Sequence, residues 1–126
     1  MRLKFSGLAE SELAAIPLRD RKTLWVAIRL LKTEPYPDGV YGDITVDSVP
    51  VRFFSKESPP GHRLKVKKPP LSYRVLYVVD EEHEVVVIIS VLTRSGAYPE
   101  TDFYLAMFRA IIADYYNNEG WKYDLH

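Results

Sequence analysis

The 126-residue sequence contains no cysteine, only six glycines and three histidines. Without cysteine, disulfide bonds, thiolate nucleophiles and zinc–sulfur sites are excluded. No glycine-rich phosphate loop and no GxSxG nucleophile elbow is present, so nucleotide-dependent transfer and ordinary serine hydrolase chemistry have no support. The histidines, His62, His83 and His126, lie in a loop, an acidic turn and the C-terminus, without metal-ligand spacing. We therefore expect neither a metal nor a cofactor.

Long apolar runs are also missing. The N-terminal stretch MRLKFSGLAESEL lacks the apolar centre of a signal peptide, and no segment approaches the roughly 18 apolar residues of a membrane span. We expect a cytoplasmic protein with no membrane partner. Hydrophobic residues make up 47% of the chain and charged residues 27%, a composition typical of a single folded domain of this length.

Acidic residues are absent from one block of the chain. Lys plus Arg and Asp plus Glu both number 17, so the formal net charge is zero. Residues 58–79 nevertheless contain no Asp or Glu, and they hold five cations, which are Arg63, Lys65, Lys67, Lys68 and Arg74. A neutral total thus conceals a basic segment, and such local asymmetry favours binding of a polyanion.

The helical periodicity predicts a hairpin of two helices near the N-terminus. A short strand at residues 2–5 comes first, followed by a helix at 8–16 that Pro17 ends. Asp20 is a suitable N-cap for a second helix that runs to about residue 32 with one apolar stripe. A further amphipathic helix opens at residues 99–102 and ends near Asn118, where turn formers follow.

The remaining segments predict strands. Residues 40–55 read as a hairpin or an edge strand, because Pro50 disfavours a central position. Three strands follow, at 63–68, 73–79 and 84–93. The last two are apolar on both faces, which places them at the centre of a sheet covered on both sides. The prediction is an α+β fold with a mostly antiparallel sheet.

The basic block contains the candidate site. Lys65 and Lys67 are two residues apart on a strand, so both side chains leave one face while Leu64 and Val66 turn toward the core. Two neighbouring ammonium groups repel each other, which lets one lose its proton and act as a base while the other holds a phosphate. Arg74 opens the next predicted strand, and an arginine fork suits phosphate.

Two residues further along extend this set. Arg94 ends the strand after that of Arg74, and Tyr98 follows in a turn, where its ring is suited to stack on an unpaired base. A simpler interpretation stays open for all five residues. Alternating lysines are most often a solvated strand face or a guard against edge-to-edge pairing, and Arg94 and Tyr98 could be plain loop residues.

The stretch KVKKPPLSYRVLYVVDEEHEVVVIISVLTRSGAY, residues 65–98, resembles the C-terminal half of the RelE/ParE toxin superfamily. Shared features are a Lys-rich strand, a YR strand, an acidic turn, a Val/Ile strand, and an arginine followed by a tyrosine. The resemblance implies a RelE-like fold, in which the N-terminal helical hairpin packs on a twisted sheet. It makes residues 1–126 one toxin domain, enlarged by a C-terminal helical extension at 99–126.

Within this superfamily the closer similarity is to the RelE-like ribosome-dependent mRNA endonucleases. That resemblance implies a type II toxin with a cognate antitoxin, which cleaves mRNA in the ribosomal A site by metal-independent attack of a 2′-OH. Lys67 would be the base, Lys65 and Arg74 would stabilise the phosphorane-like charge, Arg94 would assist the leaving oxygen, and Tyr98 would stack on a base. Two alternatives remain, a ParE-like inhibitor of DNA gyrase and an inactive relative that serves as an interaction module.

Overall fold

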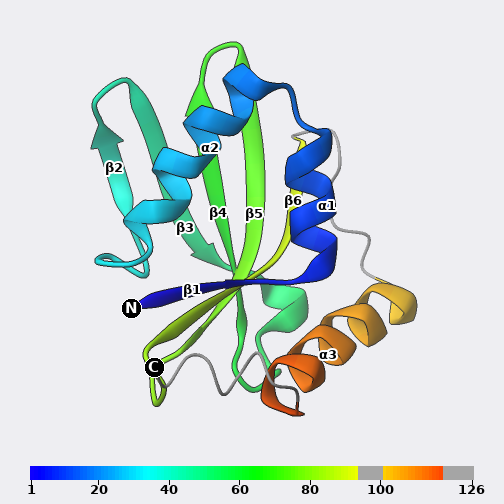
Figure 1. Ribbon diagram of the computed structural model, residues 1–126. Helices are drawn as coiled ribbons and strands as arrows, with labels where there is room; N and C mark the ends of the chain where they lie inside the picture. The colour runs from blue at the N-terminus through cyan, green and yellow to red at the C-terminus, as the bar shows by residue number, and fades with distance from the viewer. Residues whose placement is uncertain (94–100, 118–126) are drawn as a thin grey trace.

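The computed structural model describes residues 1–93 and 101–117, which form a six-stranded sheet with helices on both faces (Figure 1). The elements follow in the order β1 (Arg2–Phe5), α1 (Gly7–Ala15), α2 (Leu18–Leu30), β2 (Asp38–Tyr41), β3 (Ile44–Pro50), the 3-10 turn η1 (Arg52–Phe54), β4 (Gly61–Lys68), β5 (Leu71–Asp80), β6 (Val85–Thr93) and α3 (Asp102–Asn117). The strand order is β1-β6-β5-β4-β3-β2. β1 runs parallel to β6 and the other neighbours are antiparallel, so the predicted α+β, mostly antiparallel fold is confirmed.

The two N-terminal helices begin in different ways. Ser6 caps α1, because its Oγ accepts a hydrogen bond from the Ala9 amide at 3.0 Å. The prediction that Asp20 caps the second helix is wrong, since α2 already begins at Leu18, directly after Pro17. Proline lacks an amide hydrogen, so it starts a helix without leaving a donor unpaired. Asp20 instead accepts a hydrogen bond from the Tyr73 hydroxyl at 3.0 Å, which ties α2 to β5.

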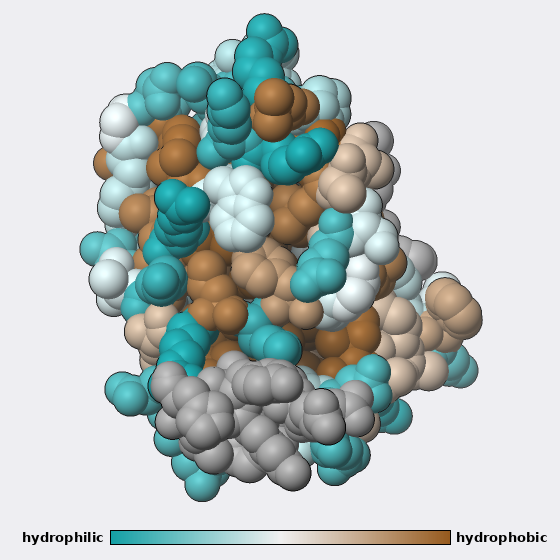
Figure 2. All heavy atoms as spheres, viewed as in Figure 1, coloured by the Kyte–Doolittle hydropathy of each residue, from teal (hydrophilic) through white to brown (hydrophobic). Residues whose placement is uncertain are grey.

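The first helical layer, α1 and α2, covers one face of the sheet. Leucine, isoleucine and alanine side chains of both helices pack on apolar residues of β3 to β6, among them Leu64, Val66, Val75 and Ile88. In Figure 2 polar residues follow the outer surfaces of the two helices, and apolar residues are visible between them. α1 also shields the edge of β6 beyond the end of β1, because Glu12 accepts hydrogen bonds from Ser90 Oγ at 2.8 Å and from the Val91 amide at 2.9 Å.

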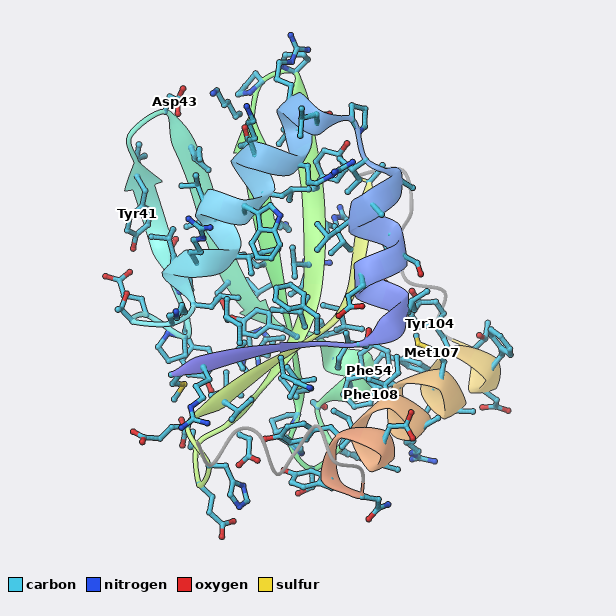
Figure 3. The ribbon with its side chains drawn as sticks, in the orientation of Figure 1. Tyr41, Asp43, Phe54, Tyr104, Met107 and Phe108 are labelled. Carbon is cyan, nitrogen blue, oxygen red and sulfur yellow. The ribbon has the colours of Figure 1, made fainter. Side chains whose placement is uncertain are left out.

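The second layer, η1 and α3, covers part of the opposite face. Its apolar cluster joins Phe54, Phe108, Ile112 and Tyr115 to strand residues that include Leu76 and Val87. The rings of Phe54 and Phe108 stack at 4.4 Å between centroids, and they point toward each other in Figure 3. The predicted C-terminal helix is thus present, and it buries an apolar stripe on the sheet.

The sheet centre and the hairpin also match the sequence. Val75 to Val78 of β5 and Val85 to Ile89 of β6 are at most 1% exposed, as the predicted two-sided cover requires. β2 and β3 form the predicted hairpin, but it begins at Asp38, before the predicted range 40–55, and Pro50 ends β3. Gly42 lies in the turn with a φ of 65°, a conformation that favours glycine. No helix among the described residues has the length and apolar composition needed to cross a membrane.

Candidate functional site

β4 presents Lys65 and Lys67 on the face of the sheet that carries η1 and α3. Leu64 and Val66 are fully buried against the layer of α1 and α2. Because strand side chains alternate, Lys65 and Lys67 leave the opposite face. The sequence predicted this alternation of side chains. The burial of Leu64 and Val66 fixes the face on which the two lysines lie.

Arg74 joins the two lysines through strand register. Arg74 of β5 is directly opposite Lys65 of β4, and Ser72 is opposite Lys67. Side chains of directly opposed residues leave the same face, with their Cβ atoms about 4.5–5.5 Å apart. Tyr73 points to the other face, where its hydroxyl binds Asp20. Burial raises the pKa of Tyr73, and the hydrogen bond to Asp20 raises it further, so the phenol stays a donor that anchors this end of β5.

These residues line one small cavity, which we call the cation cavity. Its volume is about 130 Å³, and its lining consists of Lys65, Lys67, Ser72, Tyr73 and Arg74. η1 and α3 pack on another part of the same face, over Leu76, Val78 and their neighbours. Among the described residues, those that line the cation cavity all come from β4 and β5 and none from a helix.

The cations of the cation cavity, Lys65, Lys67 and Arg74, have no ion-pair partner in the part of the chain that the structure describes. Lys68 differs from them, since its Nζ lies 3.0 Å from Asp43 Oδ2 on the α2 side of the sheet. The hydrogen bond from Lys68 lowers the pKa of Asp43 below its usual value. Three cations beside one cavity, without a described ion-pair partner, are an arrangement suited to a phosphate.

Two charged residues beside the cation cavity were not predicted as site residues. Arg63 lies two positions before Lys65 and therefore on the same face, a relation already visible in the alternation of the sequence. Asp47 of β3 is opposite Lys65 and brings a carboxylate to this face. No sequence signal could have revealed Asp47, because only the pairing of β3 with β4 places it there.

The other two predicted site residues, Arg94 and Tyr98, lie outside the described residues. The strand that leads to Arg94 is nevertheless well held. Glu12 binds both Ser90 and Val91, and Thr93 of β6 is opposite Tyr73 of β5. β6 therefore ends at Thr93, opposite Tyr73, which lines the cation cavity.

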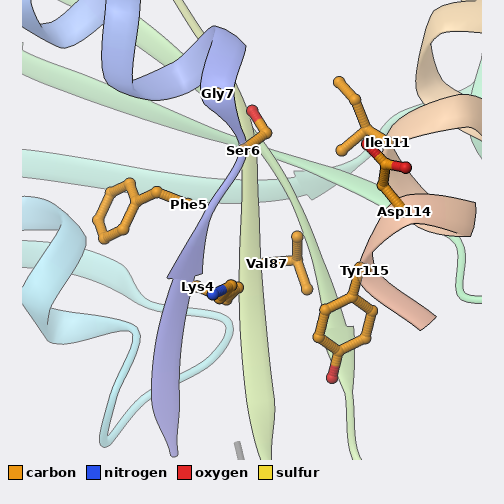
Figure 4. A pocket seen from close by; sticks show the side chains of 8 residues that line it. All are labelled: Lys4, Phe5, Ser6, Gly7, Val87, Ile111, Asp114 and Tyr115. Carbon is orange, nitrogen blue, oxygen red and sulfur yellow. The ribbon is translucent and has the colours of Figure 1, made fainter. Parts of the chain in front are cut away.

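A larger cavity of about 280 Å³ lies between β1, the start of α1 and α3 (Figure 4). Its lining is mixed, and the charged side chains there are Lys4 and Asp114. This pair offers neither a cluster of cations nor a nucleophile with a base. The described residues also contain no group of three or more His, Cys, Asp and Glu side chains placed to bind a metal ion. The cation cavity is the stronger candidate site.

Chemically, the cation cavity can bind and polarise a phosphodiester. An ammonium and a guanidinium on adjacent strands can contact two oxygens of one phosphate, and the charge that develops in a phosphorane-like transition state strengthens both contacts. An amine that has lost its proton can take a proton from a nearby hydroxyl. In such a cavity, lysine and arginine side chains supply the positive charge that balances the phosphate.

No protein-family model matches the sequence, and no curated protein is significantly similar to it. Solved structures do match. The toxin–antitoxin complex RelBE2 from Mycobacterium tuberculosis is similar with a TM-score of 0.51 and 26% identity, over 74% of this chain and 96% of that chain. The archaeal RelE–RelB complex from Pyrococcus horikoshii OT3 gives a TM-score of 0.47 at 18% identity, over 76% and 97% of the two chains. A mutant of the E. coli toxin RelE in the free state gives 0.47 at 17% identity, over 88% and 93%. The chain therefore has a RelE-like toxin fold.

Proposed function

We propose that this chain with a RelE-like fold is the toxin of a type II toxin–antitoxin system, and that it cleaves mRNA in the ribosomal A site. The observation that carries the proposal is the cation cavity, where Lys65, Lys67 and Arg74 stand together without a described carboxylate partner. The similarity to RelBE2, a toxin–antitoxin complex, supports the assignment to a toxin with a protein antitoxin.

In the proposed reaction the 2′-oxygen of a nucleotide attacks the adjacent phosphorus. Lys67 acts as the base and takes the proton of the 2′-OH. The bond from the 2′-oxygen to phosphorus forms as the bond to the 5′-oxygen breaks, which leaves a 2′,3′-cyclic phosphate and a 5′-hydroxyl. Lys65 and Arg74 bind the non-bridging oxygens, whose negative charge grows in the transition state.

The two residues outside the described ranges complete the proposal. Arg94 stabilises the departing 5′-oxygen, which takes up a proton from water as it leaves. Tyr98 stacks on a base of the codon and holds the nucleotide in place, because an aromatic ring stacks on any base.

Induced expression in bacteria tests this function. We expect the wild-type chain to arrest growth and to produce mRNA ends in phase with codons. The double variant Lys65→Ala with Arg94→Ala should remove both effects. Lys68→Ala is the matched control, since this lysine lies on the same strand but faces the other side, and it should behave as wild type.

The contrary outcomes are distinct. Growth arrest that persists in the double variant would overturn the assigned site. Loss of DNA supercoiling without codon-phased mRNA ends would identify a ParE-like gyrase inhibitor instead. Absence of toxicity, without a small acidic protein that co-purifies, would indicate an inactive interaction module. Cleavage by purified protein on programmed ribosomes is expected to continue in the presence of a chelator that leaves the ribosome intact.

A further inference from the structure

We propose that Arg63 binds a second phosphate of the RNA, one nucleotide away from the phosphate held in the cation cavity. The inference rests on the proposed function, because it takes RNA as the ligand. It adds a binding subsite that determines how the strand runs across the sheet.

The packing of its neighbours fixes the face on which Arg63 lies. Leu64 is fully buried on the side of α1 and α2. His62 faces that side as well, because its ring lies 4.8 Å from the ring of Tyr36 and 5.8 Å from that of Tyr77. Arg63, between them, therefore faces the side of Lys65 and Lys67. The three cations form a single row along β4.

Arg63 stands where the apolar cover of this face ends. Its partner on β5 is Leu76, which is fully buried in the cluster with Phe54 and Phe108. Its partner on β3 is Val49. The methylene groups of Arg63 thus lie beside apolar side chains, while Lys65, the next cation in the row, lines the cation cavity. Arg63 therefore lies on β4 between the apolar cluster and the cation cavity.

The guanidinium of Arg63 has hydrogen-bonding capacity to spare. The side chain is half-buried, and its Nε is shielded from solvent without a hydrogen-bond partner among the described residues. It forms no ion pair there either, although Asp47 lies on the neighbouring strand, diagonal to it. The two terminal nitrogens of the guanidinium are not among the shielded atoms, so they are the groups that can reach a phosphate. The planar fork favours two contacts from these nitrogens to one phosphate.

The spacing of the row fits a single strand of RNA. Residues two apart on a strand are about 6.6 Å apart along its axis, so Arg63 and Lys67 are separated by about 13 Å. Consecutive phosphates of an extended single strand lie at a spacing similar to that between Arg63 and Lys65. A strand that places one phosphate between Lys65, Lys67 and Arg74 therefore brings its neighbour to Arg63.

Single-turnover cleavage on ribosomes programmed with short synthetic mRNA tests the contact. One mRNA is unmodified, and two others carry a neutral methylphosphonate at the linkage on either side of the cleaved one. For wild type, neutralising one of these linkages should raise the half-saturating protein concentration about tenfold, the order expected when a hydrogen bond to a charged group is lost. Arg63→Ala should show the same rise with unmodified mRNA, and no further rise when that linkage is neutral.

Control variants separate this contact from a structural role. Lys68→Ala should match wild type on all three mRNAs, and Arg63→Lys should recover part of the affinity. The change for Arg63→Ala should appear in half-saturation more than in the rate at saturation. Arg63→Gln, similar in length but uncharged, replaces the alanine variant if the latter unfolds.

The outcomes are decisive in both directions. If Arg63→Ala and the neutral linkage weaken binding additively, or if Arg63→Ala lowers only the saturated rate, Arg63 does not contact that phosphate. If Arg63→Ala weakens binding of an antitoxin but not of mRNA, the subsite belongs to the protein partner and the inference is overturned. Wild-type protein that fails to cleave any of the mRNAs would instead overturn the proposed function, and the inference with it.

Discussion

Two halves of one sheet face differ in what they contain, although the same strands form both. Under η1 and α3, Leu76 of β5 is fully buried in an apolar cluster. Two residues earlier on the same strand, Arg74 lines the cation cavity, where no described helix packs. The covered half buries apolar side chains, whereas the cation half holds charges that have no ion-pair partner among the described residues. Stability and activity should therefore respond to different residues of one face.

The largest effect is expected in the covered half. Phe108 is 1% exposed and stacks on Phe54. Its replacement by alanine removes a ring from the centre of the apolar cluster, so the free energy of unfolding should fall by about 3–5 kcal/mol. Urea denaturation measures this change. Phe103→Ala, in the same helix but 79% exposed, should change it by less than about 0.5 kcal/mol. A wild-type midpoint for Phe108→Ala would refute the packing of α3.

In the cation half the effect should fall on activity alone. Lys65→Ala removes one charge that stabilises the transition state, so single-turnover cleavage on ribosomes should slow by about 10²–10³-fold. Its urea midpoint should stay that of wild type, because the side chain has no described ion pair to lose. Lys68→Ala serves as the control for both measurements. If Lys65→Ala lowers the urea midpoint as well as the cleavage rate, the cation half also stabilises the fold and the prediction is wrong.

A steric test addresses the boundary of the covered half. A Cβ added at Gly61 would lie 2.8 Å from Phe54 Cβ and 3.2 Å from the Phe108 ring. Gly61→Ala should therefore lower the free energy of unfolding by about 1–3 kcal/mol, as overpacking does. Gly7→Ala, where a Cβ meets nothing within 4 Å, should not destabilise the fold. Equal thermal midpoints for the two variants would show that the cluster has room to adjust.

Low pH should reduce the free energy of unfolding through Asp80, which lies at the end of β5 and binds α3. Asp80 accepts hydrogen bonds from Tyr115 of α3 at 2.9 Å and from the His83 ring at 2.7 Å. Burial acts to raise the pKa of Asp80, but these hydrogen bonds outweigh it and hold the pKa below its usual value. A depressed pKa stabilises the fold above the unfolded value, near 4, and this contribution disappears as the pH falls through the folded value.

The comparison of wild type with Asp80→Asn isolates this contribution. Urea denaturation at several pH values should show wild type to be more stable at pH 7, with the difference shrinking below about pH 4. A difference that stays constant down to pH 3 would mean that the hydrogen bonds to Asp80 do not depend on its charge.

The smallest effect concerns the carboxylate beside the cation cavity. Asp47 is opposite Lys65 and should repel an incoming phosphate. Asp47→Asn should tighten binding of mRNA by about two- to fivefold, the range of a partly exposed charge interaction. Asp43→Asn is the control, since Asp43 pairs with Lys68 on the other side of the sheet. Weaker binding in Asp47→Asn would mean that this carboxylate itself contacts the RNA.

The sequence predicted most of the fold because each element has a local cause. Alternation placed Leu64 and Val66 inside, and apolar runs placed β5 and β6 at the centre of the sheet. The start of α2 was predicted wrongly, because Asp20 resembles a cap until its partner Tyr73, 53 residues away, is known. A polar side chain near a helix start can serve either the helix or a distant strand, and periodicity does not distinguish these roles.

For the candidate site, the sequence alone determined which residues carry positive charge and that Lys65 and Lys67 share a face, since strand side chains alternate with a period of two. Only the tertiary structure decided that Arg74 and Asp47 are both opposite Lys65, and that α3 packs on the neighbouring half of this face. Register and cover depend on contacts between residues far apart in the chain, and a shift of one residue would reverse the face of every side chain.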